Sequence, residues 1–345
     1  MQTDPKRRVQ WILGALLLSS LQITAADILY VADDGNNAVY RYQPPSTTPF
    51  TFATGFNGEL FGLATGSDGQ LYTVNNIGNL IQRFDSGGSL AGGFGTGGQV
   101  DIMALTSAQA FGPVGVAYSP AGGGSLVVSA YNSGHLIRLN AATGAWDTSF
   151  GIGGLLDAGD QDNGERPIGV AYNATGNFIY YTREDGSIRR VAADGTGDVA
   201  INLNLPVSIL PYGIGMNSDS SLYVADLYTS EVLKFNLTGT DAMLDAGYGT
   251  GGRVSVTSGV FGLAVSMTGA VYVTGGQTVS LISPDGSSVS PYLTGFGNST
   301  GIAIFANPIP EARTTAMVGV VFIGGCLWVR RRALKADAEV RGGVA

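Results

Sequence analysis

The chain has very little of the chemistry on which cysteine and histidine sites depend. Its 345 residues include one cysteine, Cys326, and one histidine, His135. A disulfide framework needs paired cysteines and a cysteine-based zinc site needs several, so both are excluded. Acid–base catalysis through histidine, including Ser-His-Asp chemistry, would have to use His135 alone. That residue stands in the segment NSGHLIRLN, which predicts an exposed position beside a hairpin turn.

Charged residues are also scarce, at 13% of the chain, and only 18 residues are lysine or arginine. We call residues 27–307 the body. It contains 9 lysines and arginines against 22 aspartates and glutamates, a net charge of −13. A body this acidic repels phosphate backbones, so nucleic acid is excluded as a partner.

Apolar runs occur at both ends, and each is short for a membrane span. At the N-terminus three basic residues precede an apolar run over 11–18, and Ala25 and Ala26 follow. This three-part pattern predicts a signal peptide over residues 1–26. A membrane anchor is the alternative, but it needs about 20 apolar residues and this run is broken by Ser19 and Ser20.

The C-terminal run predicts a transmembrane helix over about residues 314–329. Three arginines follow it, and such clusters stay on the cytoplasmic side, so the body would lie outside the inner membrane. The basic cluster consists of Arg330, Arg331 and Arg332.

Residues 308–345 together resemble a PEP-CTERM sorting signal, in which a Pro-Glu motif precedes a hydrophobic segment and a basic cluster. The motif is carried by Pro308, Pro310 and Glu311. The resemblance implies processing by an exosortase-type protease, transient anchoring in the inner membrane of a Gram-negative bacterium, and release to the cell envelope or the exterior, alongside exopolysaccharide. An ordinary single-pass anchor is the alternative.

Glycine is abundant, with 53 residues, and several of these glycines belong to a repeated sequence motif. Each copy has a glycine in a short apolar strand, then a polar turn and an alternating apolar strand, which is hairpin chemistry. Five such glycines lie 53, 54, 44 and 49 residues apart, a spacing typical of propeller blades. They are Gly62, Gly115, Gly169, Gly213 and Gly262.

Half-repeats stand at the two ends of the body. Residues 299–306, STGIAIFA, begin a sixth copy, and residues 27–43 match the second half of one. We therefore predict an all-β fold, a six-bladed β-propeller over residues 27–307. Its last blade would take the innermost strand from the C-terminal part and the outer strands from the N-terminal part.

The repeats resemble those of the NHL family, most closely over Pro211–Thr240 and Phe61–Gly88. A rigid ring with variable loops is a good platform for partners. Six-bladed relatives also include metal-dependent lactonases of the gluconolactonase type, which hold a divalent cation with Glu, Asn and Asp. Residues of these types near strand ends are Asp33, Glu59, Asn75 and Asp226. Asp226 also fits an ordinary structural place in the repeat.

A second sequence motif recurs at residues 89–100, 145–156 and 243–254. We predict that its aromatic residue plugs the space between blades while its glycines adopt positive φ. A phosphate-binding loop is disfavoured because no Gly-Lys-Ser/Thr or helical pattern follows. The aromatic residues are Phe94, Phe150 and Tyr248.

The segment 155–167 is rich in carboxylates, and Asp160, Asp162 and Glu165 suggest a surface Ca²⁺ site. A solvated acidic loop without metal is the alternative. The arginines Arg183, Arg189 and Arg190 fit a hydrated outer strand or a contact with an acidic sugar.

Taken together, these features predict an exported, non-enzymatic binding or scaffold propeller. Its partners would be an extracellular polysaccharide or an envelope protein. Two alternatives stay open, namely a metal-dependent lactonase-like hydrolase and a spacer without a specific ligand.

Overall fold

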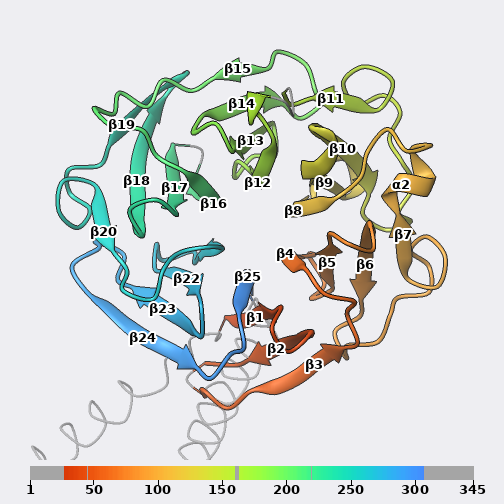
Figure 1. Cartoon of the computed structure of the whole chain (residues 1–345), viewed down its shortest axis with the longest axis horizontal. Coiled ribbons are helices and arrows are strands. Elements are labelled where there is room, and N and C mark those ends of the chain that lie inside the picture. Colours follow the sequence, from red (N-terminus) through yellow and green to blue (C-terminus); the bar gives the residue numbers. More distant parts are fainter. Residues whose placement is uncertain (1–26, 45, 160–162, 219, 307–345) are drawn as a thin grey trace, which may run out of the picture. The chain divides into compact units, whose positions relative to one another are not determined.

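The predicted six-bladed propeller is confirmed. The computed structural model describes residues 27–44, 46–159, 163–218 and 220–306. These residues form six antiparallel sheets, five with four strands and one with five (Figure 1). The innermost strand of each sheet contacts the innermost strands of both neighbouring sheets, and these contacts close into a ring.

We letter the blades A to F along the chain and give their strands from the axis outward. Blade A contains β25 (Ser299–Phe305), β1 (Ile28–Asp33), β2 (Ala38–Tyr42) and β3 (Phe50–Thr54). Blade B contains β4 (Leu60–Thr65), β5 (Leu71–Asn75), β6 (Leu80–Phe84) and β7 (Gln99–Asp101). Blade C contains β8 (Pro113–Ser119), β9 (Ser125–Ala130), β10 (His135–Asn140) and β11 (Leu155–Asp157).

The second half of the ring follows the same order. Blade D contains β12 (Pro167–Tyr172), β13 (Phe178–Arg183), β14 (Ile188–Ala192) and β15 (Val199–Ala200). Blade E contains β16 (Pro211–Ser218), β17 (Ser221–Asp226), β18 (Glu231–Thr238) and β19 (Asp241–Leu244), with β20 (Arg253–Ser255) also pairing with β18. Blade F contains β21 (Leu263–Val265), β22 (Val271–Gly275), β23 (Thr278–Ile282) and β24 (Val289–Thr294).

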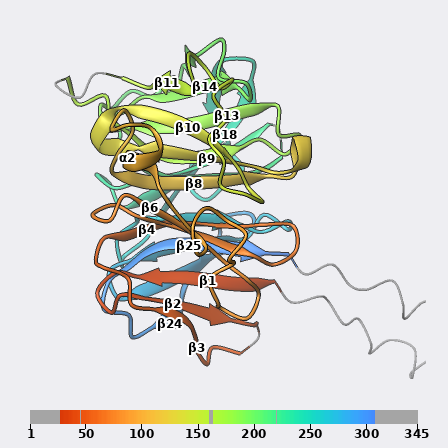
Figure 2. The same cartoon turned by 90° about the vertical axis from the view of Figure 1, so that its right-hand side faces the viewer.

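The ring closes in blade A as predicted from the half-repeats. Strand β25 pairs with β1 in an antiparallel register that places Ile28 opposite Phe305 and Tyr30 opposite Ala303. Figure 2 shows β25 and β1 side by side although they lie at opposite ends of the body. The sheet therefore joins the first and last parts of the propeller.

The core lies between the blades. Each second strand is covered by both neighbouring sheets, so β5 and β22 are buried at every position. The described residues contain six apolar clusters, and each draws on two adjacent blades. Between blades B and C, for example, Tyr72, Phe94, Val116 and Leu139 belong to one cluster. Alternation along the strands thus fills all six interfaces.

The aromatic inserts behave as predicted. Phe94, Phe150 and Tyr248 have no exposed surface. The glycine after each aromatic has positive φ and donates its N–H to a carbonyl in the next blade, for example Gly95 to Thr143 at 2.9 Å. Each insert therefore fastens one blade to the following one.

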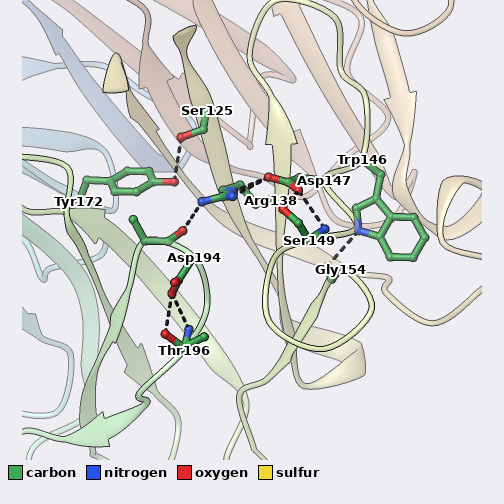
Figure 3. Close-up of polar contacts among 10 residues, drawn as sticks. Ser125, Arg138, Trp146, Asp147, Ser149, Gly154, Tyr172, Asp194 and Thr196 are labelled. Atoms are coloured by element: carbon green, nitrogen blue, oxygen red, sulfur yellow. Dashed lines mark hydrogen bonds and ion pairs between the residues drawn. The ribbon is translucent and has the colours of Figure 1, made fainter. Parts of the chain in front are cut away.

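Cations on the third strands make a second set of links between blades. Figure 3 shows Arg138 of β10 between Asp147, at 2.6 Å, and a carbonyl of the turn beside Asp194 in blade D. Arg190 of β14 likewise donates to the Gly239 carbonyl of blade E at 2.8 Å, whereas Arg189 pairs with Asp198 within blade D at 2.6 Å. These arginines are held by contacts within the propeller.

The two ends of the chain lie outside the described residues. This applies to the predicted signal peptide 1–26 and to the predicted helix 314–329. Short helical segments occur, such as α2 (Ile102–Leu105), but in the described part of the chain no helix is long and apolar enough to cross a membrane.

Candidate functional site at the mouth of the central channel

Six glycines of the innermost strands determine the width of the central channel. A β-carbon on Gly62 would lie 2.7 Å from the carbonyl oxygen of Val114 in the next blade, and one on Gly213 would lie 2.5 Å from that of Phe261. The same close approach to the next blade's backbone occurs at each channel glycine around the ring. At Gly301 it joins blade A to blade B. A side chain at these positions would collide with backbone, so glycine permits the close approach.

The channel encloses about 90 Å³, which is room for a few water molecules or one small chemical group. Sites for drug-sized ligands measure about 300–1,000 Å³. Any larger ligand would therefore rest on the channel's opening and insert only a small part of itself.

One opening, which we call the mouth, lies where the innermost strands begin. The starts of the innermost strands face the ends of the second strands, as Pro211 faces Asp226. The residue before each channel glycine lines this end of the channel. These residues are Phe61, Val114, Ile168, Tyr212, Phe261 and Thr300.

Polar groups from four blades converge at the mouth. Burial is the largest cause that raises the pKa of Tyr212, in blade E, to about 12. Tyr131 of blade C and the negative charges of Glu184 in blade D and Glu59 in blade B raise it further. Blades B and E lie opposite each other in the ring.

Arg166 links two of these groups. Its guanidinium lies over the Tyr131 ring, 5.2 Å from the centroid, and approaches the Tyr131 hydroxyl at 3.5 Å. It also lies 3.9 Å from the Glu184 carboxylate. Burial is the main cause that raises the pKa of Tyr131, and the hydrogen bond with Arg166 opposes it.

Glu59 is held in a conformation that is uncommon for a residue with a side chain. Its φ is +50°, and the hydrogen bonds around it span two blades. Gly58 N–H donates to Asn37 Oδ1 at 3.0 Å, Asn75 Nδ2 donates to the Gly58 carbonyl at 2.6 Å, and Asn76 N–H donates to the Glu59 carbonyl at 3.1 Å. These bonds hold the loop in which Glu59 adopts the left-handed backbone.

The other predicted lactonase-type candidates are engaged with backbone. Asp33 accepts from the N–H groups of Gly297 and Asn298 at 3.0 and 2.8 Å. Asp226 accepts from Leu210 N–H at 2.8 Å and from further donors in its own turn. Both carboxylates tie the loop before an innermost strand to the end of a second strand, and Asn75 does the same through Gly58.

Only one of the three predicted Ca²⁺ ligands lies in the described part of the chain. Asp160 and Asp162 fall outside it, whereas Glu165 lies 2.7 Å from Arg183. Arg183 is buried and also pairs with Asp185 at 3.0 Å. Among the described residues no group of three or more His, Cys, Asp or Glu side chains is placed to hold a metal ion. The Ca²⁺ site stays a prediction.

His135 begins β10, the third strand of blade C, opposite Ala130 and Asp157. It is partly buried, not exposed as expected from the turn beside it: the pairing of β10 with β11 places His135 inside the sheet and not at its edge. The predicted sorting residues Pro308, Pro310, Glu311, Arg330, Arg331 and Arg332 lie outside the described residues.

Sequence reasoning did not single out Tyr131, Arg166, Glu184 or Tyr212 as site residues. Tyr212 carried a usable signal, because it is the tyrosine in a place where other repeats have Val, Ile, Phe or Thr. Tyr131, Arg166 and Glu184 stand in connections beside repeat strands, where the repeat pattern is weakest.

The comparisons with known proteins support the fold. No protein-family model and no curated protein matches the sequence. Solved structures do match. Virginiamycin B lyase from Staphylococcus aureus has a TM-score of 0.53 and 11% identity, covering 79% of this chain and 85% of the lyase. A Xanthomonas campestris gluconolactonase has a TM-score of 0.50 and 17% identity, covering 70% and 78%.

A protein of unknown function from Bacteroides caccae is also similar, with a TM-score of 0.56 and 13% identity over 82% of this chain and all of that one. At such low identities the likeness concerns the fold. The chain is a six-bladed β-propeller, and its membership in the NHL family stays a prediction.

Proposed function

We propose that this protein is an exported, non-enzymatic binding propeller that recruits a polysaccharide or protein of the cell envelope through its mouth. The observation that carries the proposal is the position of Glu59, Tyr131, Glu184 and Tyr212 beside strand ends of four blades at the mouth of a narrow channel, where Arg166 contacts both Tyr131 and Glu184. A few polar groups beside aromatic side chains in a concave position are typical of ligand sites. The ring holds them on strand ends, which makes the site rigid.

The contacts of the lactonase-type candidates favour binding over metal-dependent hydrolysis. Such hydrolysis would require oxygen ligands that face the channel. The carboxylates of Asp33 and Asp226 instead accept backbone N–H bonds that hold the loops in place. A structural role accounts for these residues.

The proposed compartment rests on the two ends of the sequence. We expect cleavage near Ala26, membrane insertion over 314–329, and processing by an exosortase-type protease near Pro308 to Glu311. The test is the intact mass of the protein from its native host, with peptide mapping. A mature chain that ends around 308–312 supports processing; a chain that retains 314–332 would make the tail a lasting anchor.

Binding is tested by immobilising the full chain and passing envelope extract from its own host over it. We expect the wild type to retain a defined component, and the variant Tyr131→Ala/Tyr212→Ala to lose it. Met267→Ala is the control, because Met267 is 85% exposed in the turn at the opposite end of the channel. Equal retention by the double variant would contradict a site at the mouth.

A further inference from the structure

We propose that the face of the ring around the mouth docks a protein segment, which places one aliphatic side chain in the channel opening and carries lysine or arginine beside it. This inference rests on the proposed function, because it names the class of partner at the same site, a protein and not a polysaccharide. Two exposed apolar patches, one on each side of the channel opening, carry the inference.

The first patch belongs to blade B. Ile77, in the turn between β5 and β6, is 62% exposed, and Met103 and Leu105 of α2 are also exposed. Asn79 joins this turn to the helix. Its carbonyl accepts from Ile102 N–H at 2.9 Å, and its side-chain amide lies 3.7 Å from the Met103 sulfur. The exposed apolar side chains of blade B therefore stand on two segments that are fixed to each other.

The second patch belongs to blade E. Tyr228, in the turn between β17 and β18, is 81% exposed, and Val207 is exposed in the connection that leads to β16. Leu227 N–H donates to the Leu210 carbonyl at 2.9 Å. Asp226 also accepts from Leu210 N–H at 2.8 Å and from Tyr228 N–H at 3.1 Å. These bonds fasten the turn to the connection, so this patch is also held in place.

The channel opening between the two patches is itself apolar. Blades B and E lie on opposite sides of the ring, so the patches flank the opening (Figure 1). The residues that line this end of the channel include Phe61, Val114, Ile168 and Phe261. The enclosed volume of about 90 Å³ gives room for one small group, such as the side chain of valine or leucine. The side chains that contribute most to protein binding typically fill pockets of this kind.

The chemistry of the patches favours a protein over a polysaccharide. Four of their five exposed side chains are aliphatic, and Tyr228 alone among them offers a planar ring on which a sugar could stack. Grouped apolar side chains mark surfaces that contact proteins, and methionine is enriched in such surfaces. A polysaccharide presents hydroxyl groups, and these would lose hydrogen bonds to water against aliphatic side chains.

Charge determines what should flank the aliphatic residue of the partner. The body carries nine basic against 22 acidic residues, so its field attracts cations. At the mouth end Arg166 and Arg183 each lie beside a carboxylate, at 3.9 and 2.7 Å, so both of these positive charges are compensated. A segment with lysine or arginine complements this surface, whereas an acidic segment would be repelled.

The test starts from random dodecapeptides displayed on phage and selected on the immobilised full chain. We expect the enriched sequences to combine an aliphatic residue with lysine or arginine. A synthetic peptide of an enriched sequence is then titrated into the full chain by calorimetry. Replacing its aliphatic residue by serine should weaken binding at least about tenfold, and replacing its basic residues by glutamate should do the same.

Paired variants of the chain locate the binding. Ile77→Ser/Met103→Ser disrupts the patch of blade B and should weaken peptide binding at least about tenfold. Val207→Ser/Tyr228→Ser disrupts the patch of blade E and should have the same effect. Met267→Ser is the matched control, because Met267 is 85% exposed but lies in the turn at the other end of the channel. Since all these side chains are exposed, every variant should keep the unfolding temperature of the wild type.

Three results of these experiments would overturn the inference. They are a selection that enriches no sequence, peptides that bind both paired variants as tightly as the wild type, and an equal loss of binding with Met267→Ser. The last result would show that apolar side chains anywhere on the surface attract the peptide.

The retained envelope component separates this inference from the proposed function. Protease treatment of the extract should abolish its retention, and glycosidase treatment should not. If retention instead survives the protease, is lost after the glycosidase and still depends on Tyr131 and Tyr212, the proposed function stands. The partner is then a polysaccharide, and the inference of a docked protein fails.

Discussion

At the scale of single residues, backbone carbonyl groups of the next blade leave room only for glycine at the six channel positions. We expect Gly62→Ala to destabilise the protein by about 1–3 kcal/mol, because its β-carbon would lie 2.7 Å from a backbone oxygen that side-chain motion cannot relieve. Urea unfolding measures the loss. Gly92→Ala is the control, because open space surrounds that position. Equal stability of both variants would contradict the packing account.

Buried tyrosines make stability depend on alkaline pH. Burial raises the pKa of Tyr42, Tyr72, Tyr212 and Tyr272 to about 12, from about 10 for a free tyrosine. The folded state therefore holds these protons more tightly than the unfolded state. Their contribution is complete below about pH 10 and is lost as pH rises to about 12.

This alkaline loss is measured by urea unfolding on both sides of about pH 10, together with the ultraviolet absorbance of tyrosinate. We expect Tyr212→Phe to reduce the loss, because one titrating hydroxyl is removed. Tyr228→Phe should leave it unchanged, since Tyr228 is 81% exposed. A pH-independent unfolding midpoint across this range would contradict the burial of these hydroxyls.

Single residues also mark the limit of what the sequence predicts. The channel glycines could be predicted because they recur in every repeat. Asp226 could be recognised as a plausible structural residue because it stands in a repeated sequence motif. Arg166 and Glu184 follow no repeat. They flank the pairing of Pro167 in β12 with Arg183 in β13, and Glu184 N–H donates to the Arg166 carbonyl at 3.0 Å. What the local pattern does not encode is the contact of Arg166 with Tyr131 of the neighbouring blade C.

At the scale of elements, the inserts fasten blades B, C and E to the blades that follow them. Phe150 is fully buried between blades C and D, whereas Ile152 is two residues away and 91% exposed. We expect Phe150→Ala to lower the free energy of unfolding by about 3–5 kcal/mol and Ile152→Ala to change it by less than about 0.5 kcal/mol.

Chemical denaturation of both variants checks this expectation. Similar losses would show that the insert behaves as a surface loop. The insert was predictable because each of its three copies has an aromatic residue followed by three glycines at the same relative positions. The contacts of the third-strand arginines were not predictable. Arg138 and Arg190 donate to backbone carbonyls of the neighbouring blade, and which carbonyls they reach depends on how the blades pack in the ring.

At the scale of the whole molecule, closure of blade A holds the ring together. A variant that ends at residue 298 lacks β25 and leaves β1 without its innermost partner. We expect it to lose cooperative unfolding, measured by circular dichroism in urea. A variant that ends at residue 306 keeps β25 and should match the full chain. Equal midpoints for the two truncations would contradict the closure.

The whole-molecule architecture was the most predictable level, because complementary half-repeats specify which strands must pair. The mouth was the least predictable, because Glu59, Tyr131, Glu184 and Tyr212 belong to separate blades and share one opening only when the ring closes. A repeat reveals what the blades share, whereas a ligand site is made of the residues in which they differ.

The most direct test of the account is hydrogen–deuterium exchange of the full chain with and without the envelope component that it retains. Binding at the mouth predicts slower exchange in four separate segments, 56–60, 130–134, 183–186 and 210–213, with outer strands such as β3 and β24 unaffected. Protection confined to outer strands, or to a single blade, would contradict a binding site built by the ring.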